Sequence, residues 1–250
     1  MRLLDCFTED TPSLRLTDLS QHLGVSKAQV LRIVSTLERG NYLARDAETK
    51  RYRLGVRLFH LGMIVRQQMD VRTVALPHLR RLAEHTDETA ALFVPDPLGP
   101  ICLDVVQSRQ VMRVFAQPGS RMPWHAGTTS KVILAHLPEG EREGILAQGT
   151  FKRYTAHTIT DPGRIRQILA EIRLTGFHVS DRDLDADALG VGAPIFDGSG
   201  EIAGAIGVAA PAVRLHDGAL GRIVDLVCAA TAEISRQLGH PPPALLAGDD

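Results

Sequence analysis

The 250-residue sequence predicts an α+β protein with a small N-terminal winged helix-turn-helix, a connecting helix and a larger domain built on one antiparallel sheet. Two short helical patterns flank Gly24, and a charged hairpin over residues 42–54 follows them. Beyond residue 70, strand pairs separated by turn residues alternate with amphipathic helices. A chain of this length can form two ordinary domains, each with its own core.

The composition excludes several classes of protein. Aromatic residues make up only 4% of the chain, which argues against a stacking platform for single-stranded nucleic acid. The three cysteines, Cys6, Cys102 and Cys228, lie far apart, which argues against a disulfide framework. The N-terminus lacks a basic-then-apolar signal segment, and no run of eighteen apolar residues occurs. We therefore expect a cytoplasmic protein that makes no contact with a membrane.

The most informative stretch is the second helical pattern, residues 26–39, which follows a first helix over residues 17–23. Ser26 and Gln29 have the spacing of a capping box, and Gly40 marks the end of the helix. A capped helix with hydrogen-bond donors near its N-terminus suits the major groove of DNA, where Gln pairs with adenine and Arg or Lys with guanine or phosphate. The apolar stripe expected to be buried is Val30, Ile33, Val34 and Leu37. The residues expected to contact DNA are Ser26, Lys27, Gln29, Arg32, Ser35 and Arg39.

The hairpin after this helix predicts a wing that lies along phosphates, contacted by Lys50, Arg51 and Arg53. Residues 1–66 hold eleven Lys/Arg and seven Asp/Glu, a net charge of +4, whereas the whole chain carries −1. This asymmetry indicates that the N-terminal part faces an anion. The alternative is an ordinary helical segment, because helix–Gly–helix sequences with polar outer faces also occur in proteins that do not bind DNA.

Two flanking segments have helical patterns. Residues 2–8 predict a short first helix with Leu3, Leu4 and Phe7 facing inward. Residues 55–69 predict a helix that is too apolar to remain free in water. It packs either on a second copy of the chain, which would let two recognition helices grip two half-sites, or within its own chain.

The larger domain has clear turn and cap signals. Residues 96–99 and 197–200 read as turns between strands, and Asp161 followed by Pro162 reads as the start of a helix. Helices are expected at residues 71–85 (interrupted near the start by Pro77), 129–137, 139–148, 161–174 and 218–238. Strands are expected at residues 90–94, 101–106, 110–116, 177–180, 192–196 and 202–210, and a loose tail at 240–250.

Nearly the whole chain resembles the IclR family of bacterial transcriptional regulators. The resemblance lies in residues 19–54, in Trp124-His125-Ala126-Gly127, in Ser130-Lys131, in residues 173–197 and in residues 204–211. It implies a winged helix-turn-helix domain (residues 1–54), a linker helix (55–70), a GAF-like effector-binding domain (71–240) and a flexible tail (241–250). It also implies a transcriptional regulator that binds a double-stranded DNA operator and a small organic effector, and that forms a homodimer or homotetramer.

The resemblance implies a small-molecule pocket in the second domain. The loop after His125 would cover the ligand, and the backbone amides of Thr128 and Thr129 would hold an acidic group. Relatives that bind small carboxylic acids carry polar side chains at four positions that are here Ser180, Gly190, Gly207 and Ala209. Losing those donors leaves more apolar surface, which favours a larger or aromatic acid over glyoxylate. The walls expected for the pocket are Met112, Val114, Trp124 and Leu189. The alternative is a vestigial pocket that the protein's own side chains fill.

Other chemistry is not supported. Asp181, Asp183, Asp185 and Asp187 alternate like a calcium loop, but Ala186 and Gly192 stand where that loop needs Gly and Glu, so we interpret the acids as an exposed edge. No pair of ligands has zinc spacing, and we expect no metal and no cofactor.

Catalysis is also not expected. Cys102 is expected to be buried in a strand, and Lys131 to pair with a local carboxylate or carbonyl rather than to activate Ser130. The competing hypothesis is a carrier or an enzyme that uses His125 or Cys102, with the N-terminal domain serving only assembly.

Overall fold

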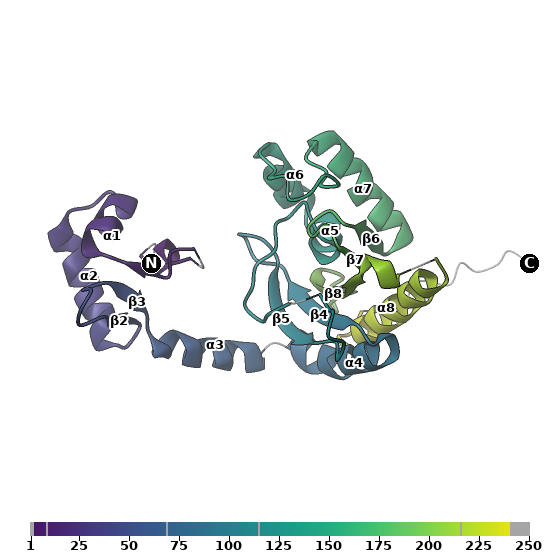
Figure 1. The fold of residues 1–250 in the computed structure, drawn as a ribbon, viewed down its shortest axis with the longest axis horizontal. Coiled ribbons are helices and arrows are strands. Elements are labelled where there is room, and N and C mark those ends of the chain that lie inside the picture. Colours follow the sequence, from purple (N-terminus) through teal and green to yellow (C-terminus); the bar gives the residue numbers. More distant parts are fainter. Residues whose placement is uncertain (1–2, 9, 69, 115, 216, 241–250) are drawn as a thin grey trace, which may run out of the picture. The chain divides into compact units, whose positions relative to one another are not determined.

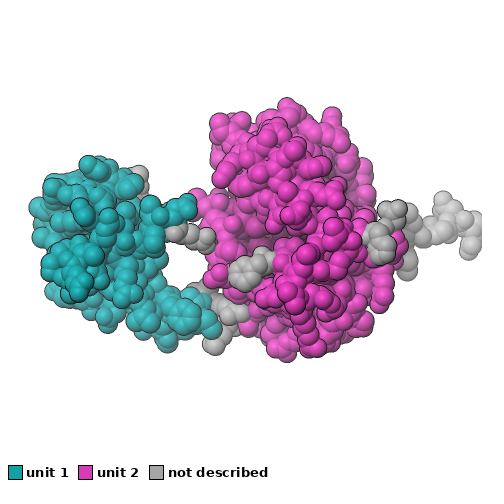
Figure 2. Space-filling view, in the orientation of Figure 1, with its two compact units in different colours: residues 1–68 teal, residues 69–250 magenta. Residues whose placement is uncertain are grey.

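The computed structural model describes residues 3–8, 10–68, 70–114, 116–215 and 217–240. The chain forms two compact units, residues 1–68 and 69–250 (Figures 1 and 2). The predicted tail over residues 241–250 lies outside the described residues. Among the helices of the described ranges, none is long and apolar enough to cross a membrane.

The first unit is a winged helix-turn-helix, as predicted. Gly24 ends the first helix in the left-handed conformation, with φ 66°, and Leu19, Val30 and Val34 are fully buried between the helices and the small sheet. The three antiparallel strands run in the order β1-β3-β2. The elements are η1 (Leu4–Cys6), β1 (Ser13–Leu14), α1 (Leu16–Leu23), α2 (Lys27–Arg39), β2 (Leu43–Arg45), β3 (Tyr52–Leu54) and α3 (Val56–Gln68).

Two expectations for the first unit are wrong in detail. The predicted helix over residues 2–8 is a single 3-10 turn within the described residues, because the backbone becomes extended at Phe7. Ile33 is 45% exposed rather than buried. Each residue advances about 100° around a helix, so Ile33 lies to one side of the stripe that Val30 and Val34 fill.

The second unit has three layers. Its antiparallel sheet runs in the order β5-β4-β8-β7-β6, with α4 and α8 packed on one face and α5, α6 and α7 on the other (Figure 1). The helices are α4 (Asp70–Thr86), α5 (Thr128–His136), α6 (Glu139–Ala147), α7 (Pro162–Thr175), η2 (Ala212–Arg214) and α8 (Asp217–Gln237). The strands are β4 (Thr89–Val94), β5 (Ile101–Val106), β6 (His178–Asp181), β7 (Ala188–Phe196) and β8 (Ile202–Pro211).

The second unit corrects three expectations. No strand forms over the described part of residues 110–116, where Val111 is 99% exposed and the chain leaves the sheet edge. β7 begins at Ala188, four residues earlier than predicted, because it pairs with β6 and β8 on both sides. α4 continues through Pro77, since Ala75 and Leu79 on either side of it are fully buried and hold the helix on the sheet.

Candidate DNA-binding surface and effector cavity

The predicted recognition helix α2 is capped as expected. Ser26 is its N-cap and accepts a hydrogen bond from the amide of Gln29 at 3.4 Å. The side-chain oxygen of Gln29 in turn accepts from the amide and the hydroxyl of Ser26, both at 3.1 Å. The cap therefore uses the side-chain oxygen of Gln29 and not its NH₂ group.

The other residues predicted on α2 differ in their exposure. Lys27 and Arg32 are exposed, and Ser35 is half-buried. Arg39 is exposed, but its Nε donates to the carbonyl of Ser35 at 3.2 Å. A contact with DNA through α2 therefore depends most on Lys27 and Arg32.

The wing carries fewer available cations than predicted. Arg51 is half-buried and donates from its guanidinium to the carbonyl of Ser13 at 2.9 Å, so it ties β3 to β1. Lys50 has φ 57° and donates to the carbonyl of Ala47 at 2.6 Å. Arg53 is exposed on β3.

Two arginines near the wing were missed. Arg15 and Arg45 line a groove together with Lys50 and Leu31, between the start of α1, α2 and the wing. Arg45 also stacks over the ring of Tyr52, with 5.4 Å between its Cζ and the ring centroid. Arg45 begins the polar run over residues 45–50, and that run was the sequence signal that could have found it.

A cavity of about 330 Å³ lies in the second unit, between the sheet, the N-terminus of α5 and the segment after β6. Eight of the eleven residues predicted for the effector pocket line it: Val114, Thr128, Thr129, Ser180, Leu189, Gly190, Gly207 and Ala209. Apolar side chains that the sequence did not single out, such as Ala91, Phe93, Met122 and Leu184, form much of the remaining wall.

Three predicted residues lie elsewhere. Met112 is 64% exposed on the segment that leaves the sheet. Trp124 lines a separate surface groove beside Pro97 and Leu137. His125 is buried, but its Nε2 is bonded to the carbonyl of Lys152 at 2.8 Å and its ring packs 4.9 Å from that of Phe151. The loop after His125 contributes through Gly127 and the start of α5 instead.

The glycines of the cavity do not simply create room. A Cβ added at Gly207 would lie 2.7 Å from Cγ2 of Thr129, and one at Gly190 would lie 3.0 Å from Cγ2 of Thr128. Gly192, which pairs with Gly207 across β7 and β8, would place a Cβ 2.9 Å from the hydroxyl of Thr128. We call these three residues the glycine floor. The first turn of α5 packs directly on the backbone of the glycine floor. The expectation that glycine at these positions leaves more room for a ligand is therefore wrong.

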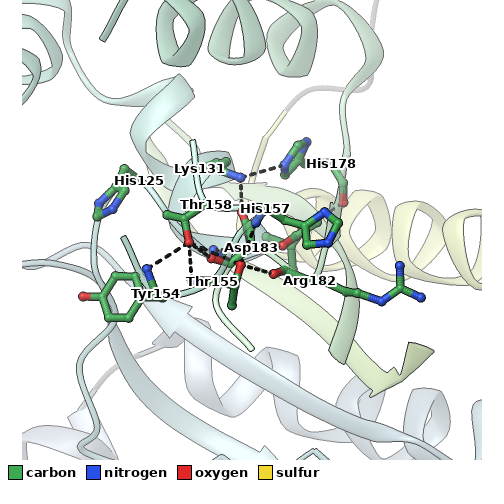
Figure 3. A network of polar contacts seen from close by, with 12 residues as sticks. His125, Lys131, Tyr154, Thr155, His157, Thr158, His178, Arg182 and Asp183 are labelled. Carbon is green, nitrogen blue, oxygen red and sulfur yellow. Dashed lines mark hydrogen bonds and ion pairs between the residues drawn. The ribbon is translucent and has the colours of Figure 1, made fainter. Parts of the chain in front are cut away.

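A buried ion pair stands beside the cavity (Figure 3). The ammonium of Lys131 on α5 pairs with the carboxylate of Asp183, and the two side chains are 3% and 5% exposed. The same carboxylate accepts from the hydroxyl of Ser180 and from the amide of Gly127, the latter at 3.1 Å. Lys131 thus pairs with a local carboxylate, as predicted, whereas the placement of Asp183 on an exposed edge is wrong.

The loop that carries Asp183 is anchored from a second side. The hydroxyl of Thr158 donates to the carbonyl of Asp183 at 2.6 Å, and that of Thr155 donates to the carbonyl of Arg182 at 2.6 Å (Figure 3). Thr158 also accepts from the amides of Tyr154 and Thr155. Residues 154–158 therefore brace the segment that follows β6.

The charges in this network shift two pKa values. Burial alone raises the pKa of Asp183, but the charge of Lys131 and the hydrogen bonds from Lys131, Ser180 and Gly127 outweigh it and hold the pKa below its usual value. Burial, followed by the nearby charge of Lys131, lowers the pKa of His178 to about 4. At neutral pH the network therefore consists of a carboxylate, an ammonium and a neutral imidazole.

Most side-chain donors around the cavity are already in use. The hydroxyl of Thr89 donates to the carbonyl of Val114, and that of Thr128 donates to the carbonyl of His178, both at 2.8 Å. Ser180 donates to Asp183. The amides of Thr128 and Thr129 are the first two of α5, so no intrahelical carbonyl is available to them. The arrangement offers one pair of backbone donors, at the start of α5, in a cavity whose wall is mostly apolar but includes Asp183 and Asp185.

The residues considered for metal or nucleophilic chemistry can be placed within the part of the chain that the structure describes. Within the described ranges, no group of three or more His, Cys, Asp or Glu side chains could hold a metal ion. Cys102 is only 2% exposed within β5. Ser130 is fully buried, and its neighbour Lys131 is engaged with Asp183.

Comparison with known proteins agrees with both units. The model of the IclR helix-turn-helix domain matches residues 1–47, and that of the bacterial transcriptional regulator IclR C-terminal domain matches residues 63–236. The HTH-type transcriptional regulator KipR of Bacillus subtilis is 32% identical over 240 residues, which cover 96% of this chain and 95% of KipR.

Solved structures give the same result. An IclR-type transcriptional regulator from Silicibacter sp. TM1040 superposes with a TM-score of 0.87 at 26% identity, covering 97% of this chain and 95% of that one. An IclR homologue from Microbacterium hydrocarbonoxydans, solved in complex with 4-hydroxybenzoate, shares the fold with a TM-score of 0.77 at 24% identity, covering 95% and 96%. The chain belongs to the IclR family of bacterial transcriptional regulators.

Proposed function

We propose that this protein controls a catabolic or metabolic operon in the bacterial cytoplasm by binding operator DNA through its first unit and a small organic acid through its second. The observation that carries the proposal is the cavity of about 330 Å³ at the start of α5, with the first two residues of that helix, Thr128 and Thr129, in its wall. A regulator needs a ligand site separate from its DNA-binding surface, and the two units supply one each.

The DNA-binding part of the proposal rests on α2 and the wing. The exposed Arg32 is the side chain best suited to read a base edge, and Arg53 to contact a phosphate. Replacing Arg32 with Ala should weaken operator binding by about 1–3 kcal/mol and relax sequence preference at one position. Unchanged affinity of this variant for the operator, with unchanged discrimination against scrambled DNA, would contradict the assignment.

The effector part rests on the cavity. An acid group would accept from the amides of Thr128 and Thr129, and an apolar or aromatic body would contact Phe93, Met122 and Leu189. The complex of the Microbacterium homologue with 4-hydroxybenzoate supports an aromatic acid as the first ligand class to test.

The assembly part rests on α3. Val56 and Phe59 are 76% and 70% exposed on this helix, an unfavourable arrangement in water for an isolated chain. A second copy that covers them would form a dimer and bring two α2 helices to two half-sites. Replacing Phe59 with Ser should lower both the molar mass from light scattering and the affinity for a two-half-site operator, while single half-site binding stays the same.

The experiment that tests the function is fluorescence anisotropy with duplex DNA from beside the protein's own gene, at several salt concentrations, with and without candidate acids. A specific complex that weakens steeply with salt, and whose affinity changes with one of the acids, supports the proposal. Absence of binding at low salt by folded protein would leave only the carrier or enzyme hypothesis for the second unit.

A further inference from the structure

The cavity is lined by acidic side chains although the proposed ligand is itself an acid. Its ionisable lining residues, within the described part of the chain, are Asp183 and Asp185, and neither Lys, Arg nor His lines it. The neighbouring cation, Lys131, is 2% exposed and is directed to Asp183 and to His178, whose Nε2 lies 3.5 Å from its ammonium. An acid that enters the cavity therefore meets carboxylates without an unpaired cation beside them.

Asp183 occupies the position that an anionic ligand would otherwise take. Its carboxylate accepts from the amide of Gly127, immediately before α5, from the hydroxyl of Ser180 and from the ammonium of Lys131. A helix N-terminus, a hydroxyl and an ammonium together form a strong anion site. Here a side chain of the protein fills that site.

We propose that Asp183 acts as a resident anion that limits the effector to a single acid group. This inference rests on the proposed function, because it concerns the ligand of the same cavity. One acid group can bind at the amides of Thr128 and Thr129. A second acid group would lie in an apolar wall near Asp183, where burial without a partner disfavours the charged form and like charges repel.

The test is isothermal titration calorimetry on the full-length protein with two probes that share one ring, benzoate with one acid group and terephthalate with two. The wild type should bind benzoate at least about tenfold more tightly than terephthalate. Asp183→Asn keeps the shape of the side chain and leaves Lys131 without its counter-charge. We expect this variant to bind terephthalate about tenfold more tightly than the wild type does, so that the preference for benzoate narrows.

The matched control is Asp185→Asn. Asp185 lines the same cavity but is exposed, so solvent screens its charge and the benzoate-to-terephthalate ratio should stay within about threefold of the wild-type ratio. An equal effect of both variants would mean that general negative charge sets the selectivity, and it would overturn the role of Asp183.

A second variant covers the case in which Asp183→Asn does not fold. The pair Lys131→Met and Asp183→Leu removes both buried charges together, a change that buried ion pairs often tolerate. It also frees the amide of Gly127, so the discrimination against terephthalate should relax. If neither variant gains affinity for terephthalate, the inference is wrong, whatever the wild type binds. Loss of the proposed function would appear separately, as failure of the wild type to bind operator DNA.

Discussion

The ammonium of Lys131 and the carboxylate of Asp183, 52 residues apart in the chain, form an ion pair that is almost completely withdrawn from solvent. The pair joins the first half of α5 to the segment after β6, and the two segments form two walls of one cavity. Both groups lost their hydration on folding, so each depends on the other. The pair therefore affects stability and ligand binding alike.

Removing one member of this pair should destabilise the second unit strongly. Lys131→Met leaves a buried carboxylate without its counter-charge, and the expected loss is about 3–5 kcal/mol of unfolding free energy. Adding Asp183→Leu to the same chain should restore most of that loss. Urea unfolding can be followed by the fluorescence of Trp124, because it is the single tryptophan and reports on the second unit. Equal unfolding midpoints for the single and double variants would contradict this expectation.

The glycine floor predicts an unusual pair of substitutions. Gly207→Ala should cost about 1–3 kcal/mol, because the new Cβ would lie 2.7 Å from Cγ2 of Thr129. Thr129→Ser removes the methyl group that the new Cβ would meet. Combined with Gly207→Ala in one chain, it should restore much of the lost unfolding free energy. Gly140→Ala is the control, since its Cβ meets no atom within 4 Å and alanine favours the helix. The measurement compares the unfolding midpoints of the wild type, the two single variants Gly207→Ala and Thr129→Ser, and the variant that combines them. If the losses of stability in the combined variant are simply additive, the proposed contact is wrong.

The neutral state of His178 predicts a pH dependence of stability. Its pKa falls from 6.5 to about 4 on folding, chiefly by burial and then by the charge of Lys131. Between these values the unfolded chain binds a proton that the folded chain does not. Stability should therefore fall as the pH drops from about 6.5 towards 4, by up to about 1.4 kcal/mol per pH unit from this residue.

The variant His178→Gln isolates that contribution, because the other buried histidines titrate in both chains. The stability advantage of the wild type over the variant should shrink as the solution is acidified from pH 7 to 4.5. Parallel pH profiles of the two chains would show that His178 does not titrate as we expect.

The wing predicts two arginine variants with different effects on DNA binding. Arg53 is exposed, so Arg53→Ala should reduce the slope of log affinity against log salt concentration by about one phosphate contact. Arg51 holds the carbonyl of Ser13, so Arg51→Ala should lower the melting temperature of the first unit and change the salt slope little. A larger slope change from Arg51→Ala than from Arg53→Ala would reverse the two assignments.

Local signals in the sequence were sufficient for most elements. The capping box of Ser26 and Gln29 predicted the start of α2, and Asp161 followed by Pro162 predicted the start of α7. These predictions succeeded because caps act over a few residues. The strand predicted at residues 110–116 does not form over their described part. The segment has the apolar composition of a strand, but whether a segment pairs depends on its neighbours in space, which the local sequence does not show.

The candidate site was harder to predict where it depends on contacts between distant residues. The alternating acids after Val179 gave no sign that Asp183 turns inward to Lys131. Met112 and Trp124 have the chemistry of pocket walls, but the cavity is walled by Phe93 and Met122 instead. Six of the eight predicted residues that line the cavity were placed by their position in a family pattern, which carries information on the fold that local chemistry does not, whereas of the four proposed wall residues only Val114 and Leu189 line it.

The glycine floor has a mechanical consequence. Closely packed atoms resist compression, so the first turn of α5 and the backbone of β7 and β8 act as one stiff wall. A ligand in the cavity has little means of displacing that wall. We therefore expect a ligand to displace first the part of the wall that holds Val114 and Ala116, whose carbonyls accept side-chain hydrogen bonds from Thr89 and Gln107. We expect a signal that leaves this cavity to start at Val114 and Ala116.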